Sequence, residues 1–174
     1  MLKNLTNMVL LCPEGVQEHN IRTGQLIRDL LTEIGRSDLI ELWRFGDLSP
    51  CDYHDLGKRN DDIDNLEHCE RGAAFFSDAF RKASGNKESI FCSIASDLCR
   101  YHHERWDGTG WPEHLAGDDI PIIARAAAVA NAWDHLKIRY PKINNTKLHR
   151  KLKKYEGIYF DPEIVCALLR LFPA

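Results

Sequence analysis

The sequence predicts an all-α fold, a compact bundle of helices. Apolar residues recur at intervals of three and four along several segments, which is the spacing of one face of an α-helix. No segment alternates convincingly between apolar and polar residues, as a half-buried strand would. With 174 residues and 44% hydrophobic content, the chain is long enough for one core. We therefore expect a single domain covering residues 1–174.

The first clear helix is predicted over residues 16–35. Its apolar face includes Leu26, Leu30 and Ile34, and Gly35 is well placed to end it. His19 lies on the same face and should point inward. A second short helix is expected at residues 38–45, followed by a turn-rich connection to about residue 65.

Two further helices are predicted at residues 66–80 and 88–103. In the second of these, Phe91, Ala95 and Leu98 form an apolar stripe, and His102 continues it. A histidine at the end of a buried stripe is directed toward the interior.

The last two predicted helices follow aspartates and a proline. Asp118 or Asp119 is expected to cap a helix that has Pro121 in its first turn and carries residues 122–136. Asp161 and Pro162 repeat the arrangement before the final helix, which runs to about residue 172. Both starts are typical of helix N-termini.

The composition and charge of the chain indicate which kinds of binding partner to expect. The formal net charge is −3, and acidic and basic residues appear interspersed, which argues against a nucleic acid polymer or a membrane surface. The apolar run at the N-terminus is too short to cross a bilayer and has no small-residue cleavage site. We therefore expect a cytoplasmic protein with a small-molecule ligand.

The six cysteines are scattered without any CxxC pair, so we expect reduced thiols in the core. One alternative remains open. Cys69 beside His68, and Cys99 one turn before His103, have residue types that bind zinc.

Five histidines and one aspartate stand at inward-facing or loop positions: His19, His54, Asp55, His68, His102 and His103. Neutral imidazoles and carboxylates are common ligands of transition metals. Each histidine alone is better explained as a hydrogen-bonded core residue, but several from different helices favour a shared metal site. His102 and His103 can share it only where their helix ends, because neighbouring helical residues diverge by roughly 100°.

Three motifs resemble one family. They are "HDLGK" at residues 54–58, "HHERWDGTGWP" at residues 102–112 and "FDPEIV" at residues 160–165. In this order and over nearly the whole chain, the sequence is similar to the HD-GYP family, a branch of the HD metal-dependent phosphohydrolases. The resemblance implies an all-helical domain of the HD type with a centre of two or three metals, most commonly iron or manganese. It also implies hydrolysis of cyclic di-GMP, or a related cyclic dinucleotide, to pGpG or GMP.

The resemblance also implies roles for particular residues. A first metal would be held by His19, His54, Asp55 and, at the position of the family's last aspartate, Asn131. A second metal would be held by Asp55, His68, His102 and His103, so that Asp55 bridges the two. Asp55 and Lys58 would act in catalysis, with Lys58 facing the substrate phosphate. Substrate contacts would include Gly110, Trp111, Pro112, Arg139 and Lys142, the triplet standing where the family has Gly-Tyr-Pro.

The sequence departs from the family pattern at three places. Asn131 offers an amide oxygen where the family has a carboxylate, so the first metal should be held more weakly. The alternative is that Asn131 is hydrogen-bonded between helices and that nearby Asp134 is a solvated or capping charge. A glutamate that would serve a third metal is replaced by Gly15, and only nine residues, 59–67, separate Lys58 from His68.

These departures leave three functions open. The first is a working cyclic-dinucleotide phosphodiesterase. The second is a degenerate module that binds a cyclic dinucleotide, or a partner such as a diguanylate cyclase domain, with little or no hydrolysis. The third is an HD phosphohydrolase for another nucleotide. We expect any regulation to come from a separate protein.

Overall fold

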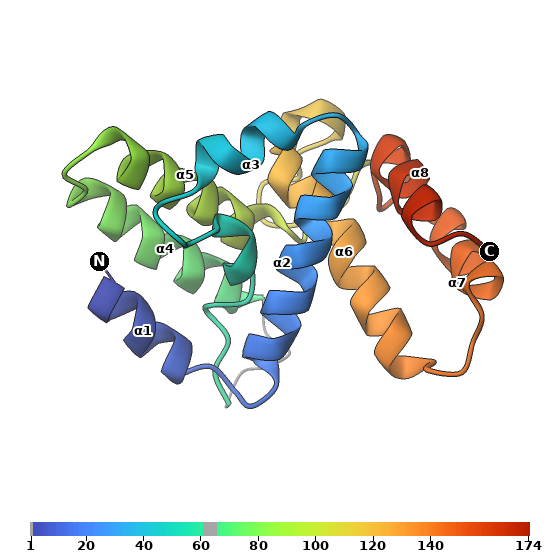
Figure 1. Ribbon diagram of the computed structural model, residues 1–174, viewed down its shortest axis with the longest axis horizontal. Helices are drawn as coiled ribbons and strands as arrows, with labels where there is room; N and C mark the ends of the chain where they lie inside the picture. The colour runs from blue at the N-terminus through green and yellow to red at the C-terminus, as the bar shows by residue number, and fades with distance from the viewer. Residues whose placement is uncertain (1, 61–65) are drawn as a thin grey trace.

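The computed structural model describes residues 2–60 and 66–174, and within them the regular structure consists of helices and isolated β-bridges (Figure 1). The elements, in order, are α1 (Leu2–Leu10), α2 (Val16–Glu33), α3 (Ser37–Trp43), the 3-10 turn η1 (Pro50–Tyr53), α4 (Glu67–Arg81), α5 (Asn86–Tyr101), the 3-10 turn η2 (Gly117–Asp119), α6 (Ile122–Arg139), α7 (Asn145–Lys153) and α8 (Pro162–Leu171). The expected all-α fold is confirmed.

Helix α6 lies at the centre of the larger core, in contact with α2, α5, α7 and α8. One side of α6 carries a stripe of buried apolar residues that includes Ala126, Val129 and Trp133. Burial extends further round the helix than one stripe, because Ala124 and Ala127 are also completely covered. These small side chains let neighbouring helices approach α6 closely.

A second core cluster lies between α4, α5 and α1. Helices α4 and α5 run side by side, and α1 lies below α4 in the view of Figure 1. Phe76 and Phe91 are completely buried there, together with Leu5 of α1 and Leu56 of the loop after η1. This cluster fixes α4 and the end of α5, which carry histidines, against the loop that contains His54.

Most predicted helix ends agree with the structure. Gly35 has a positive φ of 75° and comes directly after Ile34, the residue that caps α2, as a C-terminal glycine should. The carboxylate of Asp161 accepts a hydrogen bond of 2.8 Å from the Glu163 amide and caps α8. The predicted cap of α6 is wrong, because Asp118 lies in η2 and pairs with Arg125 at 2.7 Å instead.

Helices α1 and α7 were not expected from the sequence pattern. Helix α7 buries only Leu148 and Leu152, so most of its residues are polar and give little periodic signal. None of the helices in the described part of the chain is long and apolar enough to span a bilayer.

Candidate metal centre

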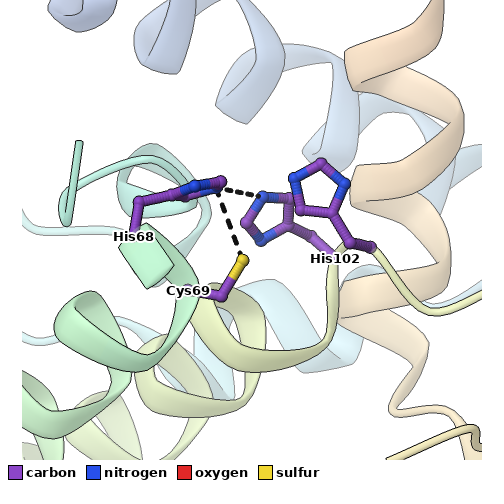
Figure 2. A group of neighbouring side chains, drawn as sticks. His68, Cys69 and His102 are labelled. Carbon is purple, nitrogen blue, oxygen red and sulfur yellow. Dashed lines mark hydrogen bonds between the residues drawn. The ribbon is translucent and has the colours of Figure 1, made fainter. Parts of the chain in front are cut away.

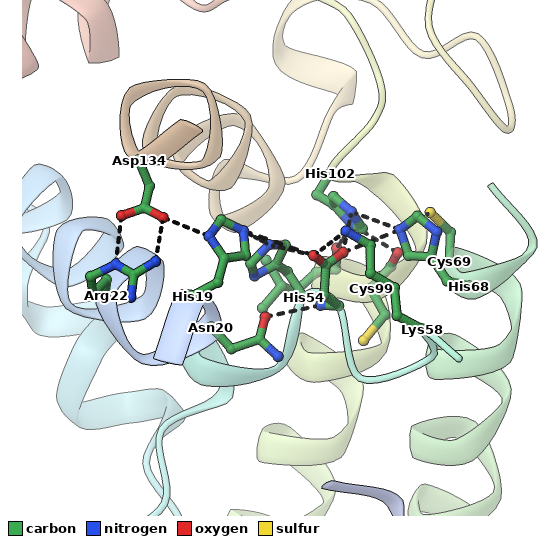
Figure 3. Close-up of polar contacts among 12 residues, drawn as sticks. His19, Asn20, Arg22, His54, Lys58, His68, Cys69, Cys99, His102 and Asp134 are labelled. Atoms are coloured by element: carbon green, nitrogen blue, oxygen red, sulfur yellow. Dashed lines mark hydrogen bonds and ion pairs between the residues drawn. The ribbon is translucent and has the colours of Figure 1, made fainter. Parts of the chain in front are cut away.

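Four segments bring the predicted histidines together (Figure 3). Helix α2 supplies His19, the loop after η1 supplies His54 and Asp55, the first turn of α4 supplies His68, and the end of α5 supplies His102. All five side chains are buried.

The carboxylate of Asp55 stands between two pairs of histidines. Its Oδ2 atom is 3.8 Å from Nε2 of His19 and 3.4 Å from Nε2 of His54. Its Oδ1 atom is 3.2 Å from Nε2 of His68 and 3.6 Å from Nε2 of His102. Among the described residues, these four approaches of the imidazoles do not meet hydrogen-bond geometry. One carboxylate thus presents one oxygen to each pair, an arrangement suited to bridging two cations.

Backbone contacts fix the ring of His102. Its Nδ1 atom lies 3.1 Å from the carbonyl oxygen of Leu98 and 3.0 Å from that of Cys99. Because a carbonyl can only accept a hydrogen bond, Nδ1 carries the proton, and the lone pair of Nε2 faces Asp55. This is the orientation in which an imidazole can bind a metal.

Asp134 fixes His19 in the same manner. Its Oδ2 atom accepts a hydrogen bond of 2.7 Å from Nδ1 of His19, and Arg22 binds both carboxylate oxygens at 2.8 and 2.9 Å. Burial alone would raise the pKa of Asp134, but His19 and Arg22 hold it well below its usual range. Asp134 is therefore a charged residue that orients His19.

The interpretation of Asp134 as a solvated or capping charge is wrong, because the residue is buried in the middle of α6. The sequence contains one indication that Asp134 faces the site. It lies one helical turn after Asn131, a predicted metal ligand, and so on the same side of the helix.

The site provides uncharged nitrogens beside a charged carboxylate. Burial lowers the pKa of His54 to about 4 and, with the neighbouring His102 and His68, that of His103 to about 2. For Asp55, burial raises the pKa, but His54 and the other surrounding imidazoles keep it well below its usual range. Near neutral pH the site therefore holds the charged carboxylate of Asp55 beside the neutral imidazoles of His54 and His103, donor types that suit a transition metal ion.

In the described part of the chain, two further buried atoms have no hydrogen-bond partner: Nδ1 of His54, and Oδ1 of Asn131 on α6. Such orphan atoms are uncommon and call for an explanation, of which an ion at the site is one. The oxygen of the Asn131 side chain therefore makes no hydrogen bond to another helix among the described residues.

Lys58 belongs to the same cluster. Its Nζ atom lies 2.6 Å from Oδ2 of Asp55, on the side of the first histidine pair. The family resemblance implies that Lys58 faces a substrate phosphate, and the structure pairs its ammonium group with the carboxylate of Asp55.

The second histidine pair includes a thiol (Figure 2). His68, Cys69, His102 and His103 each offer a ligand atom within 4.8 Å of the others. Cys99 does not join them, because its Sγ atom donates to the carbonyl oxygen of Tyr53 at 3.1 Å. Of the zinc set weighed from the sequence, Cys69 therefore lies in the cluster and Cys99 points elsewhere.

The Gly110-Trp111-Pro112 triplet packs against the end of α5. A Cβ atom on Gly110 would lie 2.2 Å from the backbone nitrogen of Arg105, so only glycine fits there. The amide of Trp111 donates to the carbonyl oxygen of His103 at 3.3 Å. The contacts seen for Gly110 and Trp111 are thus structural, and they hold the loop beside the histidines.

A cavity of about 500 Å³ opens between α6 and α7. Its charged and aromatic lining consists of His135, Arg139, Tyr140, Lys151, Lys154, Tyr155, Tyr159 and Phe160. The ring of His135 lies 4.8 Å from the ring of His19, so the cavity adjoins the histidine cluster. Arg139 lines it as part of α6, whereas Lys142 lies in the exposed turn after that helix.

Comparison with known proteins agrees with this geometry. Residues 91–164 match the HD domain family. The cyclic di-GMP phosphodiesterase of Vibrio cholerae serotype O1 is 37% identical over 84 residues, which are 47% of this chain and 17% of that protein. The cyclic di-GMP phosphodiesterase of Thermotoga maritima is 35% identical over 95 residues, 53% of this chain and 26% of that protein.

A longer alignment joins the chain to the 3'3'-cGAMP-specific phosphodiesterase 3 of Vibrio cholerae serotype O1. It runs over 132 residues at 30% identity and covers 69% of this chain and 28% of that protein. In each of these three cases the chain spans less than a third of the relative's length.

Proposed function

Because the chain carries an HD domain of the HD-GYP type, we propose that it is a metal-dependent phosphodiesterase that hydrolyses a cyclic dinucleotide. Cyclic di-GMP or a close relative is the proposed substrate, and pGpG or GMP the product. The observation that carries the proposal is the division of the Asp55 oxygens between two histidine pairs. The names of the aligned relatives support the substrate class.

The proposed ions are two transition metals, iron or manganese. A pair of ions about 3.5–4 Å apart neutralises phosphate oxygens and lowers the pKa of a bound water. In our proposal His19 and His54 hold one ion, His68, His102 and His103 hold the other, and Asp55 bridges them. Lys58 adds a positive charge where the phosphate develops negative charge.

The residues that line the cavity between α6 and α7 suit an anionic ligand with aromatic rings. Arg139, Lys151 and Lys154 line it, and none of them has an acidic partner within residues 2–60 and 66–174. Its volume is in the range typical of small-molecule sites. We propose that one nucleotide half of the substrate occupies it while the phosphodiester lies at the histidines.

The charges around this cavity differ from the sequence-based expectation. Residues 137–154 contain eight of the chain's 23 lysines and arginines and none of its 26 acidic residues. Charges are therefore not interspersed along the whole chain, and a local excess of positive charge suits a ligand with two phosphates.

The direct test is an assay of cyclic di-GMP and 3'3'-cGAMP with Mn²⁺ or Fe²⁺, read by chromatography of the linear product. We expect product from the wild type and a loss of at least about 10–100-fold in His102→Ala, because a ring held by two carbonyls is removed. His149→Ala is the matched control, since that histidine contacts the Phe172 carbonyl away from the cluster. Equal rates in the wild type and His102→Ala would contradict the proposal.

Asn131 favours a second candidate function, that of a degenerate module that binds a cyclic dinucleotide without hydrolysing it. Its neutral, buried oxygen supplies no charge to the first ion. We expect Asn131→Asp to raise metal stoichiometry and turnover, and to increase the rise in melting temperature that Mn²⁺ produces, because tighter binding to the folded state stabilises it.

The control for this change is Asn86→Asp, which adds the same charge at the opposite end of α5 from His102. Calorimetry and elemental analysis measure the effect, and the rate is read in the same preparations. A wild type that binds the dinucleotide without turnover, together with an active Asn131→Asp, would identify the native chain as a binding module. If the wild type and Asn131→Asp had the same metal content and the same rise in melting temperature with Mn²⁺, Asn131 would not face the ion.

A further inference from the structure

We propose that Cys69 is a sulfur ligand of the second metal site, beside His68, His102 and Asp55. The inference deepens the proposed function, because it assigns a further ligand to the centre on which that function rests. It concerns a thiol that the motif-based ligand set does not include.

The distances between donor atoms support this assignment. Nε2 of His68 lies 3.4 Å from Sγ of Cys69, 3.3 Å from Nε2 of His102 and 3.2 Å from Oδ1 of Asp55. Nitrogen atoms about 2.0–2.1 Å from an ion and a sulfur about 2.3 Å from it lie about 3.0–3.6 Å from one another in the common geometries. Each of the other three atoms thus lies from Nε2 of His68 at the distance of a neighbouring ligand around one ion, and the donor atoms of Cys69 and His102 lie within 4.8 Å of each other.

The direction of the thiol distinguishes Cys69 from the other cysteines near it. The thiols of Cys12 and Cys99 both donate to carbonyl oxygens, of Leu56 at 3.4 Å and of Tyr53 at 3.1 Å. The sulfur of Cys69 instead lies against the ring nitrogen of His68, in a completely buried position (Figure 2). Helix α4 therefore directs two donors, from consecutive residues, at the same point.

Binding of the metal ion by the sulfur of Cys69 releases one proton. The thiol of Cys69 gives up its proton to solvent as the metal–sulfur bond forms, because a bound cation favours the thiolate. A sulfur ligand also shifts the preference of the second site toward Fe²⁺ or Zn²⁺ and away from Mn²⁺, since thiolates favour softer ions.

Titration of the metal-free protein with Co²⁺ tests the proposal without any assay of activity. Cobalt bound to nitrogen and oxygen gives weak visible bands, and a thiolate adds an intense charge-transfer band in the near ultraviolet. We expect this band in the wild type and in Cys99→Ser, and its loss in Cys69→Ser while visible bands remain. Cys99→Ser is the matched control, because its thiol is equally buried but donates to Tyr53.

X-ray absorption of the zinc-loaded wild type provides a measurement that depends on no variant. We expect one sulfur neighbour at about 2.3 Å in addition to lighter atoms. Visible bands without the charge-transfer band, or a shell of nitrogen and oxygen alone, would overturn the role of Cys69 and leave the metal centre standing. A failure to bind any cobalt or zinc would overturn the proposed function and the inference together.

Discussion

Replacing Asp55 with asparagine is expected to remove most of the bound metal and to lower phosphodiesterase turnover by more than about 100-fold, beyond the loss typical of a supporting residue. Asparagine has one oxygen and a donor group where Asp55 has two oxygens facing separate histidine pairs. It therefore cannot bridge two ions or balance their charge. Elemental analysis and the rate of product formation measure the two losses.

Asp52→Asn is the control for this experiment. Asp52 lies three residues earlier, in η1, but its carboxylate pairs with Arg28 at 2.7 Å. We expect this variant to retain its metal, and circular dichroism to show that both variants are folded. Full metal content in Asp55→Asn would contradict the bridging role.

Gly57→Ala is expected to disrupt the centre without changing any ligand. A Cβ atom on residue 57 would lie 1.9 Å from the carbonyl oxygen of His68 and 2.8 Å from the backbone nitrogen of Gly72. Both contacts are with backbone, so α4 must move away and take His68 from Asp55. Displacement of a ligand should cost at least about 10-fold in metal affinity, and overpacking of this kind destabilises by about 1–3 kcal/mol.

Gly85→Ala makes the same substitution in open space, because a Cβ atom there meets nothing within 4 Å. Thermal unfolding with and without Mn²⁺ should show a large drop in melting temperature and a reduced metal effect for Gly57→Ala alone. If both variants matched the wild type in melting temperature and metal content, the close approach of α4 to the HDLGK loop would have no role in forming the site.

Periodic sequence patterns predicted the parts of the fold that pack by one apolar face. Helices α2, α4, α5 and α8 were located within a few residues, and the inward direction of His19 and His102 followed from their place on those faces. Inward histidines on different helices favoured a shared site, but only the family motifs indicated which segments meet, because no local pattern determines how helices pack.

The residues that escaped prediction depend on contacts between distant segments. Asp134 looks like a surface charge until α2 brings Arg22 and His19 against it, 112 and 115 residues away in the chain. Cys69 was weighed as one of several scattered thiols, and only the fold separates it from Cys99. The positive stretch at residues 137–154 was hidden because the total charge averages it against the acidic remainder.

The separation between the positive stretch at residues 137–154 and the acidic remainder of the chain acts on a ligand before it touches the protein. All 26 acidic residues lie outside residues 137–154, so the molecule carries a long-range field with its positive end at α7 and the end of α6. An anion that diffuses within a Debye length, about 8–10 Å at moderate salt, is turned toward this end and away from the acidic surface. The position of the lysines and arginines at residues 137–154 therefore affects how often an anionic ligand meets the protein in a productive orientation, as well as how strongly it binds.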